Sequence, residues 1–483
     1  MYLGLDLGTS SLKGLLIKEN GSIIGLSEFT YKVSRLQKGW SEQNPDDWIF
    51  ACKKVFNFFK SNYPSEFSAL KGIGISGQMH GATLLDLNGK VLYPCILWND
   101  TRSHTQADQL DKVKKFREIS GNIVFPGFTA PKLMWLAQNK QKIFSKISKV
   151  LLPKDFLNFW LTGEYTSDMS DGSGTSWLDT EKRQWSEDLL NYSGMVLDQM
   201  PTLYEGIDPV GSIRSSLAKE WGISKNVVVV GGAGDNAAIA CGIGIINESD
   251  TFLSLGTSGV ILTAKSSFSP RPDTAVHTFC HAIPNRWYQM GVILSSTDCL
   301  NWLSKNLGKD IKTLIKSLGH KIKRPNSVYF LPYLSGERTP HNDSLVRAAF
   351  LNLDISTTEN DLTQSVLEGV GFALRDSLEA LKASGSNITS AIAVGGGSKS
   401  LYWLKLIANI LNVSLKIPKH GEYGASLGAA KLAIIGVTGA KPEEKIISPT
   451  ISKTIFPSKD LLTPYNDAYY RYRNIYPALK SLE

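Results

Sequence analysis

Cysteine is scarce in this chain, with five among 483 residues, and the five stand far apart. An odd number without paired spacing excludes the disulfide framework of small secreted domains and favours reduced thiols in a cytoplasmic protein. His277, Cys280 and His281 lie close together and could suggest a zinc site. No second Cys/His pair stands at zinc-ligand spacing, which argues against such a site. The cysteines are Cys52, Cys95, Cys241, Cys280 and Cys299.

Long apolar runs without charge are also lacking. The longest mainly apolar stretch, residues 227–246, has Asp235 and Asn236 at its middle and several glycines. Because a carboxylate at the centre of a membrane span is costly, this stretch predicts a strand, a turn and a helix instead. The N-terminus reaches Asp6 without a basic segment, which argues against a signal peptide. We therefore expect no membrane partner.

The basic residues are dispersed, although the net charge is +8. The densest group lies between residues 140 and 154, where apolar residues alternate with the lysines and predict a helix with a solvated lysine face. Since this explanation suffices, we expect no nucleic-acid partner. The group consists of Lys140, Lys142, Lys146, Lys149 and Lys154.

What the sequence does contain is a repeated order of predicted elements. Residues 2–7 and 12–17 predict two strands joined by a Gly-Thr-Ser turn. The same order returns at 251–255 and 260–264, again around Gly-Thr-Ser. Predicted helices follow the strands in both halves, including one that opens at Asn44-Pro45. The pattern predicts an internal duplication of an α/β unit.

The duplication predicts two domains, residues 1–245 and 246–483. The length agrees, since domains usually have roughly 100–200 residues. No Pro- or Ser-rich linker separates the halves. We therefore expect closely packed domains that are joined by a hinge.

The first motif with chemical meaning is the segment from Asp6 to Lys13. A strand delivers Asp6 to a turn whose glycine, Gly8, allows the backbone to approach a phosphate. The hydroxyls of Thr9 and Ser10 can donate to phosphate oxygens, and Asp6 can hold Mg²⁺ through water. Lys13 can neutralise charge on a transferred group. The alternative is an ordinary polar hairpin, but the second Gly-Thr-Ser turn, at Gly256 and Thr257, favours a phosphate clamp.

The second motif is the glycine-rich segment 231–234, which is followed by Asp235 and Asn236. Small residues allow a tight turn from strand to helix and place Asp235 at or near a helix N-terminus, where the dipole favours an ionised carboxylate. Such a carboxylate can accept a hydroxyl proton during phosphoryl transfer. The alternative is a plain N-cap.

Two further groups complete the candidate site. Gly396 and Gly397 belong to a triple-glycine turn after a predicted strand, and with the phosphate turns this indicates an adenosine site. Met79, His80 and Trp98 lie in polar segments of the first half. A sugar needs donors and acceptors beside an apolar wall, which this group can provide, although a lone histidine such as His80 is more often structural.

These segments resemble, in order and over nearly the whole chain, the FGGY family of carbohydrate kinases. The motifs are MYLGLDLGTSSLKG, GWSEQNPDDW, GISGQMHGATLLD, ILWNDTR, PGFTAPKLMWL, VLLPKDFL, GGAGDNAA, LSLGTSGV, FLPYLSGERTPHND and GGGSKSLYW. The resemblance implies two actin-like, ribonuclease-H-related ATPase domains around a central cleft. It also implies ATP and Mg²⁺ as cofactors, and relatives suggest a homodimer.

Within the family, QMHG and SGERTPHN are typical of members that act on D-xylulose. The resemblance then implies that Asp235 is the proton acceptor and that Asp6 is the acid at the metal. It places Met79 and His80 at the sugar, with Asn236 and Trp98 beside them. Lys13 corresponds to a basic residue near the γ-phosphate.

On the nucleotide side, the resemblance assigns Gly256, Thr257, Gly396 and Gly397. Two alternatives stay open. One is a kinase of the same family that acts on another ketose, a polyol or a sugar acid. The other is a nucleotide-driven binding protein like the actin and chaperone ATPases, which need no acceptor base beside a sugar pocket.

Overall fold

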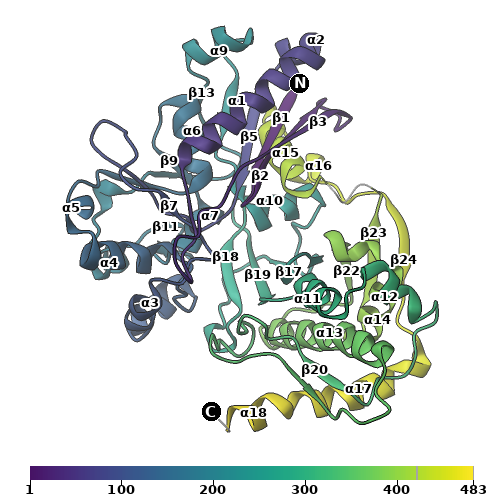
Figure 1. Cartoon of the computed structure of the whole chain (residues 1–483). Helices are drawn as coiled ribbons and strands as arrows, with labels where there is room; N and C mark the ends of the chain where they lie inside the picture. Colours follow the sequence, from purple (N-terminus) through teal and green to yellow (C-terminus); the bar gives the residue numbers. More distant parts are fainter. Residues whose placement is uncertain (420–422, 482–483) are drawn as a thin grey trace.

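The first of two large sheets is built from the N-terminal half of the chain. The computed structural model describes residues 1–419 and 423–481. In this sheet β5 and β14 run parallel to β1, whereas β2 and β3 continue as antiparallel hairpins on the other side. Figure 1 shows it in purple and teal. The strands, in spatial order, are β13 (Pro209–Ser212), β14 (Val228–Val230), β5 (Gly72–Gly77), β1 (Tyr2–Leu7), β2 (Ser11–Ile17) and β3 (Ile23–Thr30), and the short β15 (Ala233–Gly234) also pairs with β5.

The second sheet repeats this topology in the C-terminal half. β16 is antiparallel to β17 and parallel to β22, as β1 is to β2 and β5. Each sheet has an antiparallel strand at the far edge of its parallel part, namely β13 or β24. The predicted duplication is therefore confirmed. The strands, in order, are β18 (His277–Cys280), β19 (Trp287–Ile293), β17 (Gly259–Lys265), β16 (Thr251–Leu255), β22 (Ser390–Val394), β23 (Ser414–Pro418) and β24 (Ile451–Ile455).

Helices cover these sheets, which confirms the α/β class, and several begin where local signals predict. Helix α1 starts at Pro45, and the side chain of Asn44 accepts a hydrogen bond from the Asp46 amide. In the N-terminal half the helices are α1 (Pro45–Asn62), α2 (Pro64–Ser68), α3 (His104–Asp111), α4 (Thr129–Asn139), α5 (Gln141–Phe144), α6 (Pro153–Thr162), α7 (Met169–Gly172), α8 (Glu187–Tyr192), α9 (Ser215–Trp221) and α10 (Asp235–Gly242).

In the C-terminal half, the long helix α13 packs against β19 and β20, and the last two helices run beneath it (Figure 1). These helices are α11 (Thr297–Leu307), α12 (Ile311–Ser317), α13 (Glu359–Ala383), α14 (Leu401–Leu411), α15 (Gly424–Thr438), α16 (Pro442–Lys445), α17 (Lys459–Arg473) and α18 (Ile475–Lys480). Paired short strands are β4 (Glu42–Gln43) with β7 (Cys95–Ile96), β6 (Thr83–Leu85) with β8 (Lys149–Leu151), β9 (Thr166–Asp168) with β12 (Thr202–Tyr204), β10 (Leu178–Asp179) with β11 (Gln184–Trp185), and β20 (Tyr329–Leu331) with β21 (Ala349–Leu351).

Helix α15 connects the two halves, because it comes from the second half but packs on the first sheet (Figure 1). Glycines permit the close approach. A Cβ on Gly4 of β1 would lie 1.9 Å from the carbonyl oxygen of Ser426, and one on Gly428 would lie 1.8 Å from that of Ala238 in α10. Helices α10 and α15 are therefore in direct backbone contact. The boundary near residue 245 remains a prediction.

The prediction of one lysine-faced helix over 140–154 is wrong. The segment is divided among α5, β8 and α6. Lys142 and Lys146 are exposed, whereas Lys154 is completely buried. The lysines and apolar residues of this segment belong to three successive elements, and Lys154 forms a buried ion pair. Periodicity over so short a stretch cannot distinguish this arrangement from one amphipathic helix.

All five cysteines have free thiols and are buried. Among the described residues, every helix falls short of the length and apolar character that crossing a membrane requires.

Candidate active site

The register of the first sheet places the two predicted catalytic carboxylates at one end. Asp6 pairs with Lys13 across β1 and β2, and with Ser76 across β1 and β5. Ser76 in turn pairs with Ala233 of β15, directly before the helix that starts at Asp235. The hydroxyl of Ser76 donates to Asp6 Oδ1 at 3.4 Å. Asp6 and Asp235 are therefore separated by a single strand.

Asp235 is the first residue of α10, and Gly234 is the N-cap. The plain N-cap alternative is therefore wrong for Asp235. Its Oδ1 accepts hydrogen bonds from the Asn236 backbone amide at 2.7 Å and from the Asn236 side-chain amide at 2.9 Å. Asn236 thus holds one carboxylate oxygen and leaves Oδ2 for another partner.

Burial raises the pKa of both acids, and the charge of Asp6 adds to the effect on Asp235. Burial, and then the negative charge of Asp6, raise the pKa of Asp235 to about 7, against the two Asn236 bonds. Burial also raises the pKa of Asp6 to about 6, which the charge of Lys13 opposes. A carboxylate with a pKa near neutrality can accept and release a proton at physiological pH.

A cavity of about 460 Å³ lies between the two sheets and is lined by both. Asp6 and Lys13 line it from the first sheet, and Gly395 and Gly396 line it from the turn after β22. Gly395 has a φ of 87°, a conformation that favours glycine. The cavity therefore brings together three of the predicted residues, namely Asp6, Lys13 and Gly396.

Several residues that line this cavity were not predicted. Ile417 and Pro418 end β23 and supply apolar surface, and Lys399 adds a second cation. The only signal for Lys399 was its place in the GGGSKS segment. Ile417 and Pro418 lack a motif, because they line the cavity through the pairing of β22 with β23.

The turn with Gly256 and Thr257 lies directly beside the triple-glycine turn. A Cβ on Gly395 would lie 2.7 Å from the carbonyl oxygen of Leu255, the residue before Gly256. The carbonyl oxygen of Thr257 accepts from the Ser296 amide at 2.7 Å. Gly397 is buried against Leu255. The two predicted nucleotide turns are therefore in contact.

The turn at Gly8, Thr9 and Ser10 is held by hydrogen bonds and exposes Ser10 to solvent. The Gly8 amide donates to the Ser11 carbonyl at 2.9 Å, and Ser10 is exposed. Thr9 Oγ1 accepts from Trp98 Nε1 at 3.0 Å. Trp98 therefore contacts the phosphate turn through its indole nitrogen.

Met79 packs against the turn before Asp235, whereas its neighbour His80 packs against Gly174. A Cβ on Gly234 would lie 2.9 Å from the Met79 sulfur, and one on Gly174 would lie 2.3 Å from His80 Nδ1. The His80 ring stacks on Phe128, with centroids 4.5 Å apart. Burial lowers the pKa of His80 to about 3, so the ring is neutral. Met79 and the Asp235 turn are therefore in contact.

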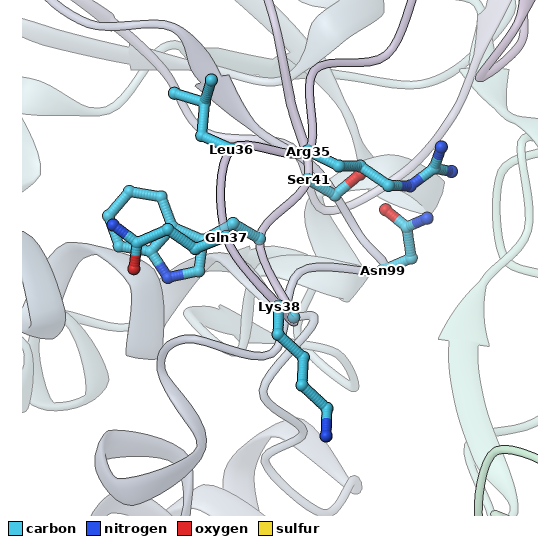
Figure 2. Close-up of a pocket in the computed structure, with 8 residues that line it drawn as sticks. Arg35, Leu36, Gln37, Lys38, Ser41 and Asn99 are labelled. Carbon is cyan, nitrogen blue, oxygen red and sulfur yellow. The ribbon is translucent and has the colours of Figure 1, made fainter.

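A second cavity of about 460 Å³ is formed by the loop 35–41 and Asn99. Figure 2 shows Arg35 and Asn99 on the same side of this loop, with Lys38 extending away from them. The lining residues include no carboxylate and none of the predicted site residues. Without an acid for a proton or a metal, this cavity does not fit the predicted chemistry.

The carboxylate of Asp6 fits a divalent cation that is bound together with the phosphates of a nucleotide. The described residues contain no cluster of three or more His, Cys, Asp or Glu side chains arranged to hold a metal by themselves. Asp6 lines the cavity and offers oxygen donors. Mg²⁺ is commonly held by one or two carboxylates together with substrate phosphates, which is the arrangement that Asp6 permits.

Comparisons with known proteins match the chain along its length. The models of the N-terminal and C-terminal domains of the FGGY family of carbohydrate kinases match residues 1–242 and 251–437. The chain is 41% identical to a xylulose kinase of Escherichia coli (strain K12), with 100% of each chain covered. It is 42% identical to one of Klebsiella pneumoniae, covering 93% of this chain and 92% of the relative. A crystal structure of a xyloylose kinase from Brucella ovis is 54% identical, covers 100% of both chains and has a TM-score of 0.98.

Proposed function

Since the chain belongs to the FGGY family of carbohydrate kinases, we propose that it transfers the γ-phosphate of ATP to D-xylulose and forms ADP and D-xylulose 5-phosphate. The observation that supports this most is the placement of Asp235. Its carboxylate begins α10, has a pKa raised to about 7 and is one strand from Asp6. The xylulose kinases that resemble the whole chain support the choice of sugar.

In the proposed reaction Asp235 accepts the proton of the terminal hydroxyl as its oxygen attacks the γ-phosphorus. The bond from that phosphorus to the β-γ bridging oxygen breaks, and ADP leaves with the bond's electrons. Asn236 holds Oδ1 of Asp235, so Oδ2 faces the hydroxyl. Lys13 lines the cavity with Asp6 and stabilises negative charge on the transferred group.

Asp6 would hold the divalent cation, proposed to be Mg²⁺, together with the nucleotide phosphates. Such a cation neutralises phosphate charge and orients the γ-phosphate. The Gly8, Thr9 and Ser10 turn would bind phosphate oxygens from the first half of the chain. Gly256, Thr257, Gly396 and Gly397 would bind the nucleotide from the second half.

The sugar would bind on the side of Asp235 where Met79 packs. The apolar Met79 side chain suits the C–H face of a ketose, and neutral His80 can exchange a hydrogen bond with a hydroxyl. Asn236 and Trp98 would complete this surface. Residues 1–245 would then form the sugar domain and residues 246–483 the nucleotide domain, with closure excluding water from the γ-phosphate.

An ADP-release assay with D-xylulose, D-ribulose, glycerol and D-gluconate tests the proposal. We expect the highest kcat/KM with D-xylulose. Asp235→Asn keeps the side-chain shape but cannot accept the proton, so turnover should fall about 10²–10⁴-fold. Binding of ATP, measured by calorimetry, should persist.

Three outcomes would contradict parts of this proposal. Near-normal turnover by Asp235→Asn would exclude Asp235 as the base. A better acceptor in the panel would assign another sugar or polyol. ATP hydrolysis that no acceptor stimulates would favour a nucleotide-driven binding protein instead.

A further inference from the structure

Two lysines are completely buried in the first half of the chain, next to the segments that bear the proposed sugar and base residues. Lys132 of α4 and Lys154 of α6 both have a relative exposure of 0%. Lysine is almost never fully buried unless its ammonium group has partners. The partners of these two lysines therefore indicate what they stabilise.

Lys132 holds the backbone of His80. Its Nζ donates to the His80 carbonyl oxygen at 2.7 Å, and the Thr129 hydroxyl donates to the same oxygen at 3.2 Å. His80 has a φ of 68°, which is uncommon for a residue with a side chain. Such a conformation persists only when surrounding contacts impose it. Lys132 and Thr129 supply two of those contacts.

Lys154 holds the turn before Asp235 in a parallel way. Its Nζ donates to the Gly231 carbonyl oxygen at 3.3 Å, and the Asn158 side-chain amide donates to the same oxygen at 3.3 Å. Lys154 also forms ion pairs with Asp155 and, at 2.8 Å, with Asp168. Because these carboxylates compensate its charge, the ammonium group can remain buried beneath the turn.

The far end of the same turn is held by the same buried network. The Gly234 amide donates to the Ser170 hydroxyl oxygen at 3.1 Å, and that hydroxyl donates to Asp168. The segment between, residues 231–234, consists of three glycines and an alanine, and Gly232 has a φ of 78°. Glycine does not restrict its own backbone, so the shape of this turn depends on outside contacts.

We propose that Lys132 and Lys154 are positioning residues for phosphoryl transfer, with Lys132 fixing the sugar-side wall at His80 and Lys154 fixing the base at Asp235. The inference rests on the proposed function, because that function assigns His80 to the sugar and Asp235 to the proton. Lys132 acts through the His80 carbonyl, and Lys154 acts through the Gly231 carbonyl and through Asp168. In this proposal neither lysine contacts the substrate. The two therefore affect different kinetic constants.

Lys132→Met and Lys154→Met retain the apolar part of the side chain and remove the donor. Lys132→Met should raise KM for the ketose about tenfold and change kcat less than threefold. Lys154→Met should lower kcat about 10- to 100-fold with KM for the ketose retained, because a small displacement of a reacting group has effects of this size. Lys146→Met, at an exposed lysine, is the matched control and should leave both constants unchanged.

Lys154→Met leaves buried carboxylates without their cation and risks misfolding, so each lysine has a milder companion. Thr129→Val removes the second donor to the His80 carbonyl, and Asn158→Leu removes the second donor to that of Gly231. Thr129→Val should therefore raise KM for the ketose, as Lys132→Met does, and Asn158→Leu should lower kcat, as Lys154→Met does. Equal effects of both pairs on both constants, or lower melting temperatures with unchanged kcat and KM, would overturn the proposal.

Hydrogen exchange of the substrate-free protein separates this inference from the proposed function. Residues 79–82 should exchange faster in the Lys132 and Thr129 variants, and residues 231–236 in the Lys154 and Asn158 variants. If the wild-type protein phosphorylates none of the acceptors, the proposed function fails, and the exchange rates still decide whether the lysines hold these segments. Unchanged exchange in all four variants would overturn the positioning role.

Discussion

Asp235 owes its chemical character to neighbours that are distant in the sequence. Asn236 is adjacent and stabilises the ionised form, but burial and the charge of Asp6 outweigh it and raise the pKa. Asp6 approaches because β15 and β1 flank the same strand, β5. At the level of single residues, burial and the strand register that brings Asp6 close raise the pKa of the proposed base.

The pH dependence of activity tests this electrostatic origin. Asp235 must be ionised to accept a proton, and its pKa is about 7, so kcat/KM should fall as the pH is lowered through 7. The fall should become steeper once Asp6, whose pKa is about 6, is protonated as well. In Asp6→Asn the repelling charge is gone, the pKa of Asp235 falls, and the acid limb should move to lower pH. The pH profile of residual activity measures this shift. An acid limb that stays in place would show that Asp6 does not raise the pKa of Asp235.

The prediction of Asp235 from its motif succeeded in locating a helix start, because glycine turns and helix termini are set by neighbouring residues. The lysine group between 140 and 154 shows the limit of such arguments. Lys154 pairs with Asp168, which belongs to a different element. Burial of a charge depends on such distant partners, so no local pattern revealed it.

At the level of elements, the contact between α10 and α15 links Asp235 to the second half of the chain. Asp235 begins α10, and α15 belongs to the second half. The contact is so close that Gly428 lies against the Ala238 carbonyl. Helix α15 begins at Gly424, in a segment of small residues that permits this close packing. The element that packs against α15 could not be predicted, because small residues permit close packing with any neighbour and do not specify which one.

Gly428→Ala tests this contact. The added Cβ would lie 1.8 Å from a backbone oxygen, so the helices must separate, and the free energy of unfolding should fall by about 3 kcal/mol. Gly371→Ala in α13 is the matched control. There the Cβ would lie 2.5 Å from the mobile end of Ile410, and alanine favours the helix by about 1 kcal/mol, so the net loss should be small. Urea unfolding measures both variants, and equal losses would contradict the backbone contact.

Across the whole molecule, the two sheets repeat one topology and share the lining of the cavity. The five cysteines are all buried in the folded chain, so their reactivity is a measure of how closely it is packed. Burial raises the pKa of Cys95 and of Cys241 to about 12. Cys241 belongs to α10, the helix that begins with Asp235. The reactivity of the thiols therefore depends on opening of the native structure.

We expect the native protein to react slowly with a chromogenic disulfide reagent at pH 8, because its thiols are inaccessible and protonated. In concentrated guanidinium all five should react at once. ATP and D-xylulose together should slow the native reaction further, since ligands that bind only the folded state suppress opening. Absorbance of the released reagent measures each rate. Immediate reaction of one or more thiols in the native protein would contradict this packing.

The sequence by itself determined the α/β class, the duplication, the starts of α1 and α10, and the family. These follow from local periodicity, capping residues and the order of motifs, and the comparisons confirm the family. Only the tertiary structure decided that Asp6 and Asp235 flank one strand, that α15 packs on the sheet of the other half, and that buried lysines hold the turns at His80 and Gly231. Those contacts join residues distant in the chain, and they depend on strand register, backbone approach and the pairing of buried charge, none of which leaves a periodic trace in the sequence.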